Sequence, residues 1–145
     1  MVKELKALLA RRSWMMNLLL GFCAYMTFLY MPFDMFLKPM AEDQEVWFGI
    51  LLTGFWAKAT EPFHWLIYAA GYYGFLHMKP WMSPWAALYV GQIAIGMLVW
   101  NLTDERGGGW PAGLISGAVF AVLAVWLWLA RDQFTDLERQ PSEEE

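Results

Sequence analysis

The sequence predicts an all-α fold: a polytopic membrane bundle of four transmembrane helices with one further interfacial or re-entrant segment. Three observations lead to this prediction. Of the 145 residues, 59% are hydrophobic and 18% are aromatic, and the mean hydropathy is +0.33, above what is usual for a soluble domain. Several apolar runs reach the roughly 20 residues that a helix needs to cross a bilayer. Prolines stand at the starts of three of these runs, where a helix has no use for the missing amide.

The first apolar run extends from Trp14 to about Leu37 and follows the basic segment 1–13. No small-residue cleavage site follows the run, so we expect a retained first span and not a removed signal peptide. Pro32 and Asp34 are expected to mark the point where this helix bends or leaves the hydrocarbon, because proline interrupts the helical hydrogen bonds.

The segment 46–57, "VWFGILLTGFWA", contains about a dozen apolar residues. Such a run is too short to cross about 30 Å of hydrocarbon, which favours an interfacial or re-entrant helix. The alternative is that this segment crosses by itself, and the number of spans would then be odd. Pro62 is expected to start the second span, with a break or sharp bend between Lys58 and His64.

Three further spans are predicted at 62–79, 84–101 and 111–130, and an acidic tail, 132–145, is expected to be disordered. The membrane domain is therefore placed at 14–131. Basic residues before the first span, set against an acidic connector after it, indicate a multi-pass protein with both termini in the cytoplasm.

Composition also excludes several classes of function. The single cysteine, Cys23, rules out an internal disulfide and a thiolate zinc cluster, and the net charge of −4 argues against nucleic acid as a partner. Glu61-x-x-His64 is one half of a di-iron motif, but the chain offers no second half. His64 and His77 lack the second histidine helix that a shared haem would need. We therefore predict no metal and no cofactor.

Glu61 and His64 are the strongest candidates for chemistry. An ionisable group at membrane depth costs several kcal/mol unless it is paired or hydrated. The two residues are three apart, so on one helix they share a face and can touch. They are the candidate acid–base residues if the protein is an enzyme. The alternative is that Glu61 is an interfacial residue paired with Lys58, which is also three residues away.

The stretch "YVGQIAIGMLVWNLTDERGGG", residues 89–109, resembles the third span and following connector of the emopamil-binding protein family, the sterol isomerase branch of the EXPERA superfamily. The resemblance implies a small helical membrane bundle with a pocket for a sterol-like ligand. It also implies double-bond isomerisation by carboxylates, with an indole steadying a carbocation. Asp34, Glu61, Gln92, Glu105 and Trp126 are the positions that look like family features. The chain departs from the family in the first span, where Ala24 and Phe28 replace an expected His-x-x-x-Glu pair.

The predicted function is binding of a sterol-like, isoprenoid or cationic amphiphilic ligand in an intramembrane pocket. An isomerase-like activity would have only part of its acid–base set. The alternatives are an accessory or assembly subunit of a larger membrane complex and a small proton-coupled transporter that uses Glu61. Partners would be a lipid or sterol-like molecule and a second copy or a membrane complex. The candidate ligand-binding residues are Asp34, Glu61, His64, Gln92, Asn101, Glu105 and Trp126.

Overall fold

The computed structural model describes residue 10 and residues 12–135, and these residues are mainly helical. Most of the predicted basic segment and the last ten residues of the predicted tail lie outside the described residues. The elements, in chain order, are α2 (Trp14–Tyr25), the π-helix η1 (Met26–Tyr30), α3 (Met31–Leu37), the 3₁₀ turn η2 (Met40–Glu42), β1 (Gln44–Trp47), β2 (Ile50–Thr53), α4 (Phe55–His77), α5 (Met82–Thr103), α6 (Gly109–Leu129) and the 3₁₀ turn η3 (Ala130–Gln133).

The first predicted span is confirmed as one helical run from α2 through η1 to α3. Pro32 lies in the first turn of α3, directly after the π turn, in which Met31 N–H bonds to the Met26 carbonyl. Pro32 has no amide hydrogen to continue that pattern to the Thr27 carbonyl. The indole nitrogen of Trp65, on α4, donates to that carbonyl at 2.9 Å instead. The irregularity predicted near Pro32 is therefore a π turn within a continuous span.

The prediction of an interfacial or re-entrant helix at 46–57 is wrong. β1 and β2 form an antiparallel hairpin in which Gln44 pairs with Thr53 and Trp47 with Ile50. The connecting residues Phe48 and Gly49 have φ angles of 53° and 84°. Two consecutive positive φ angles suit the twist of a two-residue hairpin turn. The alternative of a separate crossing is also wrong, because each strand has only four residues.

The predicted break at Pro62 is absent as well. α4 begins at Phe55, after Gly54 with its φ of 57°, and continues through Pro62 to His77. The second predicted span is therefore only the later part of a longer helix. By contrast, Pro84 and Pro111 do stand where their helices begin: Ser83 has non-helical angles before Pro84, and Pro111 lies in the first turn of α6.

Within residues 12–135, three helical runs are long and apolar enough to cross a membrane: Trp14–Leu37, Met82–Thr103 and Gly109–Gln133. A helical membrane protein is thus supported, and α4 is not among these three.

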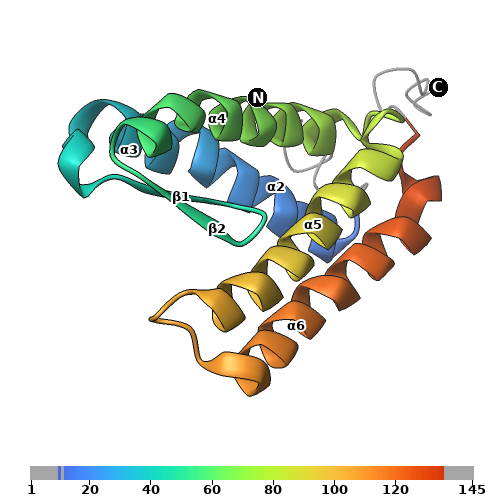
Figure 1. Ribbon diagram of the computed structural model, residues 1–145. Coiled ribbons are helices and arrows are strands. Elements are labelled where there is room, and N and C mark those ends of the chain that lie inside the picture. The colour runs from blue at the N-terminus through green and yellow to red at the C-terminus, as the bar shows by residue number, and fades with distance from the viewer. Residues whose placement is uncertain (1–9, 11, 136–145) are drawn as a thin grey trace, which may run out of the picture.

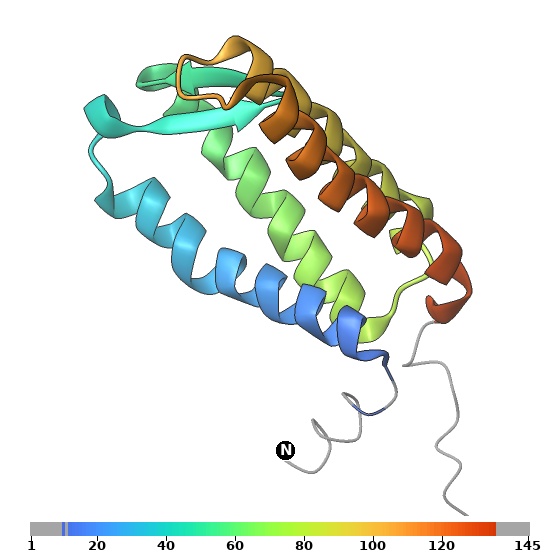
Figure 2. The same cartoon turned by 90° about the horizontal axis from the view of Figure 1, so that it is seen from below.

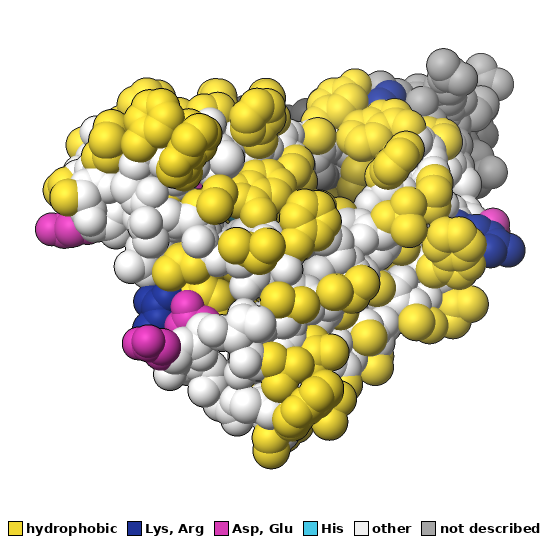
Figure 3. Space-filling view, in the orientation of Figure 1, with side chains coloured by type: hydrophobic (Ala, Val, Ile, Leu, Met, Phe, Trp, Pro, Cys, Tyr) yellow, Lys and Arg dark blue, Asp and Glu magenta, His cyan; other side chains and the backbone are white. Residues whose placement is uncertain are grey.

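The helices are arranged as two pairs joined at both ends (Figures 1 and 2). α2 lies along α4, and α5 packs closely along α6, whereas α4 and α5 touch at only a few positions. At one end, the starts of α2 and α5 meet the ends of α4 and α6 around a core of ten buried residues: Met16, Leu20, Cys23, Phe75, Met78, Met82, Ala87, Leu127, Ala130 and Phe134. At the other end, the hairpin extends from α4 toward α5, where Gly49 packs on Gly96. Apolar side chains cover much of the face seen in Figure 3, as a lipid-facing surface requires.

Candidate functional site

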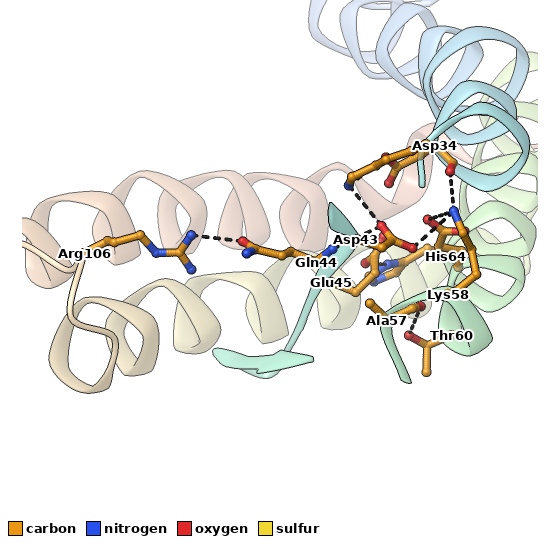
Figure 4. A network of polar contacts seen from close by, with 11 residues as sticks. Asp34, Asp43, Gln44, Glu45, Ala57, Lys58, Thr60, His64 and Arg106 are labelled. Atoms are coloured by element: carbon orange, nitrogen blue, oxygen red, sulfur yellow. Dashed lines mark hydrogen bonds and ion pairs between the residues drawn. The ribbon is translucent and has the colours of Figure 1, made fainter. Parts of the chain in front are cut away.

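Five ionisable side chains form a buried network beside the hairpin (Figure 4). Asp34 lies on α3, Asp43 is the residue before β1, and Glu61 lies on α4. These three residues are only 3%, 1% and 0% exposed. Lys38 and Lys58 supply the positive charges. The network therefore joins the end of the first span, the hairpin and α4.

The two lysines bridge the carboxylates. Lys38 Nζ lies 2.9 Å from Asp34 Oδ1 and 3.0 Å from Asp43 Oδ1. Lys58 Nζ lies 3.2 Å from Asp43 Oδ2 and 3.3 Å from Glu61 Oε2, and it donates to the Asp34 main-chain carbonyl at 2.6 Å. The predicted alternative contact between Glu61 and Lys58 is thus present, as part of a larger set of ion pairs.

The network has one carboxylate more than it has lysines. If all five groups were ionised, its charge would be −1, and a buried uncompensated charge is costly. Burial by itself would raise the pKa of Asp43, but hydrogen bonds with Lys38, Glu61 and Lys58 outweigh it and lower that pKa. The pKa of Lys38 is raised because Asp34 and Asp43 outweigh the opposing effect of burial. This distribution favours an ionised Asp43.

The three carboxylates also offer oxygens that all lie within 4.8 Å of one another, as metal ligands would. However, the ammonium groups of Lys38 and Lys58 already lie among these oxygens and supply positive charge. A divalent cation at the same place would be repelled by both lysines. The arrangement is that of an ion-pair network.

His64 belongs to a separate contact with the hairpin. Its Nδ1 lies 2.5 Å from Glu45 Oε2, and its ring stacks on Trp47 with centroids 3.9 Å apart and planes 6° apart. Glu45 and Trp47 are two residues apart on β1 and so share one face of the strand. They hold the imidazole from two sides. Among the described contacts, His64 bonds to Glu45 and not to Glu61, although Glu61 and His64 stand one turn apart on α4.

A cavity of about 310 Å³ lies between α4, the hairpin and α5. It is partly open, and Gly49 and Gly96 let the hairpin approach α5 closely at its edge. The lining is mostly apolar and aromatic, with His64 and Gln92 as polar members and the phenols of Tyr68 and Tyr89 hydrogen-bonded to each other. The lining residues are Val46, Phe48, Gly49, His64, Tyr68, Tyr89, Gln92, Ile93, Gly96, Met97 and Trp100.

The structure thus distributes the seven candidate residues among four places. His64 and Gln92 meet at the cavity, whereas Asp34 and Glu61 belong to the ionic network. Asn101 orders the turn between α5 and α6: its amide donates to the Met97 carbonyl at 2.8 Å, and its oxygen accepts from Gly108 N–H at 3.1 Å. Glu105 is exposed in that turn, and Trp126 packs against the core at the opposite end.

Sequence reasoning missed Lys38, Asp43, Glu45 and Trp47 as site residues. The first three lie in a polar connector that looks like a solvated loop. One signal was available: Glu45 and Trp47 are separated by one residue, the spacing that places two side chains on one face of a strand.

Comparison with known proteins gives no family for this chain. No family model, no curated protein and no solved structure matches it.

Proposed function

We propose that this protein is an integral membrane protein that binds a sterol-like or isoprenoid molecule in the cavity between α4, the hairpin and α5. The observation that carries the proposal is the cavity itself. A mostly apolar wall with a few convergent polar groups is typical of small-molecule sites. Its volume is near the lower end of the usual range of about 300–1,000 Å³. We therefore expect it to bury one end of a long ligand, with the remainder lying in the bilayer.

The proposal includes four spans. α4 has 23 residues, about 34 Å at the usual rise, and it lies along the first span. A second contact favours the same arrangement: Arg106, in the turn between α5 and α6, donates to Gln44 Oε1 at 3.0 Å. In the proposed arrangement the hairpin and that turn lie on one side of the membrane, and α4 returns the chain across it.

The resemblance of residues 89–109 to the emopamil-binding protein family favours the same class of ligand. Gln92, one of the positions that look like family features, lines the cavity. We do not extend the proposal to isomerisation, because the candidate carboxylates Asp34 and Glu61 are engaged by lysines in the ionic network.

Mass spectrometry of lipids retained by the detergent-purified protein tests the proposal. The Ile93→Trp variant would fill the cavity, and Leu114→Trp, at an exposed position on α6, is the matched control. We expect a retained sterol or isoprenoid in the unaltered protein and in the control, and at least a tenfold loss in Ile93→Trp. Equal retention by both variants would show lipid bound only at the outer surface and would overturn the proposal.

The proton-coupled transporter stays a second candidate because of the extra carboxylate of the ionic network. Under this alternative Glu61 would exchange its proton during transport, and Glu61→Gln would abolish proton flux in proteoliposomes. An unchanged flux would remove the alternative. An accessory subunit would instead copurify with a fixed set of membrane proteins and retain no lipid in the cavity.

A further inference from the structure

The cavity that we assign to the ligand contains no Asp, Glu, Lys or Arg among its lining residues. We propose, on the basis of the proposed function, that the ligand's head group is an uncharged alcohol that donates a hydrogen bond to His64. An apolar cavity accepts a buried charge only with an opposite charge or several hydrogen bonds beside it, and neither is built into this wall.

The contacts of the His64 imidazole suit it to a partner that donates a hydrogen bond. Nδ1 is engaged by Glu45, and one ring face is covered by Trp47. When Glu45 is ionised it accepts the Nδ1 hydrogen, so the proton of a neutral ring resides on Nδ1 and the Nε2 atom is a hydrogen-bond acceptor. A carboxylate that orients a histidine in this way fixes both its tautomer and its direction. The other ring face and the Nε2 edge are what remains to line the cavity, and Nε2 suits a hydroxyl donor.

Gln92 supplies the second polar contact, from α5 on the other side of the cavity. Its amide N–H can donate to the oxygen of the hydroxyl whose hydrogen is bonded to His64. The Tyr68 and Tyr89 phenols bond to each other, which uses the hydrogen of one of them. An alcohol oxygen between His64 and Gln92 would therefore have both a donor and an acceptor.

Charged head groups are disfavoured by the same wall. A cationic amphiphile would need a free carboxylate, but Glu45 is behind the imidazole, and Glu61 is paired with Lys58 outside the lining. A phosphate or fatty acid would need a cation, and the nearby lysines are both bound to carboxylates. The cationic ligand class expected from the sequence thus gives way to a neutral one.

Direct binding to the full-length protein in detergent tests the inference. The probes are geranylgeraniol, its methyl ether, the corresponding primary amine and monophosphate, and cholesterol, each in radiolabelled form. The ether keeps the chain and loses only the donor. We expect geranylgeraniol or cholesterol to bind. The methyl ether of geranylgeraniol should bind at least about tenfold more weakly, because it loses one buried hydrogen bond. The amine and the phosphate should bind at least as weakly as the ether. Comparing the two alcohols shows which carbon skeleton the cavity takes.

The outcomes separate the inference from the proposed function. If no probe binds, the proposed function itself fails. If a probe binds, but the ether, amine or phosphate equals or exceeds its alcohol, the cavity binds lipids and the inference about the head group is wrong.

Two variants locate the contact. His64→Phe should bind the alcohol and the ether equally, whereas His77→Phe, the same change on the same helix but away from the cavity, should keep the preference. Because His64→Phe could also loosen the hairpin, Gln92→Leu is measured in parallel and should weaken the binding of the alcohol and of the ether alike, because both keep the oxygen that accepts from Gln92. Full alcohol preference in His64→Phe would contradict the proposal.

Discussion

At the scale of residues, the extra carboxylate of the buried network determines which side chain can be lost. Asp34, Asp43 and Glu61 face two lysines. Lys58 contacts all three of these acidic residues, Asp34 through its main-chain carbonyl and the other two through their carboxylates. Removing the charge of Glu61 leaves two carboxylates and two lysines. Removing Lys58 leaves three carboxylates and one lysine. The two substitutions therefore act in opposite directions on the charge balance.

We predict that Glu61→Gln changes the free energy of unfolding by less than about 1 kcal/mol, because the amide keeps the shape and the network becomes neutral. Lys58→Met should cost about 3–5 kcal/mol, the usual penalty for leaving a buried charge without its partner. Melting in detergent measures both, and Glu105→Gln, at an exposed carboxylate, is the control. Equal losses in the two network variants would mean that the network needs the carboxylate of Glu61 as much as the ammonium of Lys58, and would contradict the charge count.

At the scale of elements, the hairpin is the part that unites the two helix pairs. Its tip approaches α5 so closely that a Cβ at Gly49 would lie 2.5 Å from Val99 Cβ and 2.6 Å from the Gly96 carbonyl oxygen. The φ of 84° at Gly49 adds a conformational requirement to this steric one. Glycine at this position therefore allows both the turn and the contact between the pairs.

We predict that Gly49→Ala lowers the melting temperature more than Gly109→Ala does. Both glycines have positive φ, so both substitutions strain the backbone, but a Cβ at Gly109 meets only Pro111 Cδ, at 4.0 Å. The difference between the two variants isolates the collision with α5. A smaller effect at Gly49 than at Gly109 would show that the hairpin can move away from α5 at little cost.

The same elements show how far sequence reasoning extends. Long apolar runs and the initial prolines of α5 and α6 predicted most of the helical bundle correctly, because length and missing amides act locally. The hairpin was missed because its strands, QEVW and ILLT, show no alternation of apolar and polar residues: in β1 the charged Glu45 is buried and the apolar Val46 is exposed. Pro62 was misjudged because its local tendency to interrupt a helix is overridden by the packing of α4 on the first span.

The candidate site was predicted only in part. His64 and Glu61 stood out because charge is costly among apolar residues. Their partners Glu45 and Asp43 come from the connector that precedes the hairpin. The long-range pairing of that connector with α4 depends on the hairpin, and the spacing of Glu45 and Trp47 is too short a pattern to predict a hairpin by itself.

At the scale of the whole molecule, α4 determines the orientation of everything that follows it. If the first span and α4 both cross, Lys79 returns to the side of the N-terminus and Glu105 lies on the opposite side. If α4 does not cross, these two positions exchange sides. The side of the membrane on which Lys79 lies therefore distinguishes the two topologies.

We predict that Lys79→Cys and Gln133→Cys are cytoplasmic and that Glu105→Cys is external. Each is introduced into a Cys23→Ala background, so that the only native thiol is removed. Labelling of intact cells with a membrane-impermeant maleimide, before and after permeabilisation, reports the side. Labelling of Lys79→Cys without permeabilisation would refute four spans.

The π turn in the first span determines how that helix responds to the loss of one residue. A π turn accommodates one residue more than an α-helical turn within about the same rotation and rise, so deleting Leu29, which is exposed, should restore α-helical winding and leave α3 in nearly the same orientation relative to α2. Asp34 would then keep its lysines. In that background Lys58→Met should cost about as much as in the parent protein, and a clearly smaller cost would show that Asp34 has left the network. The inserted residue thus lengthens the first span by one residue without changing the angle from which it reaches the buried charges.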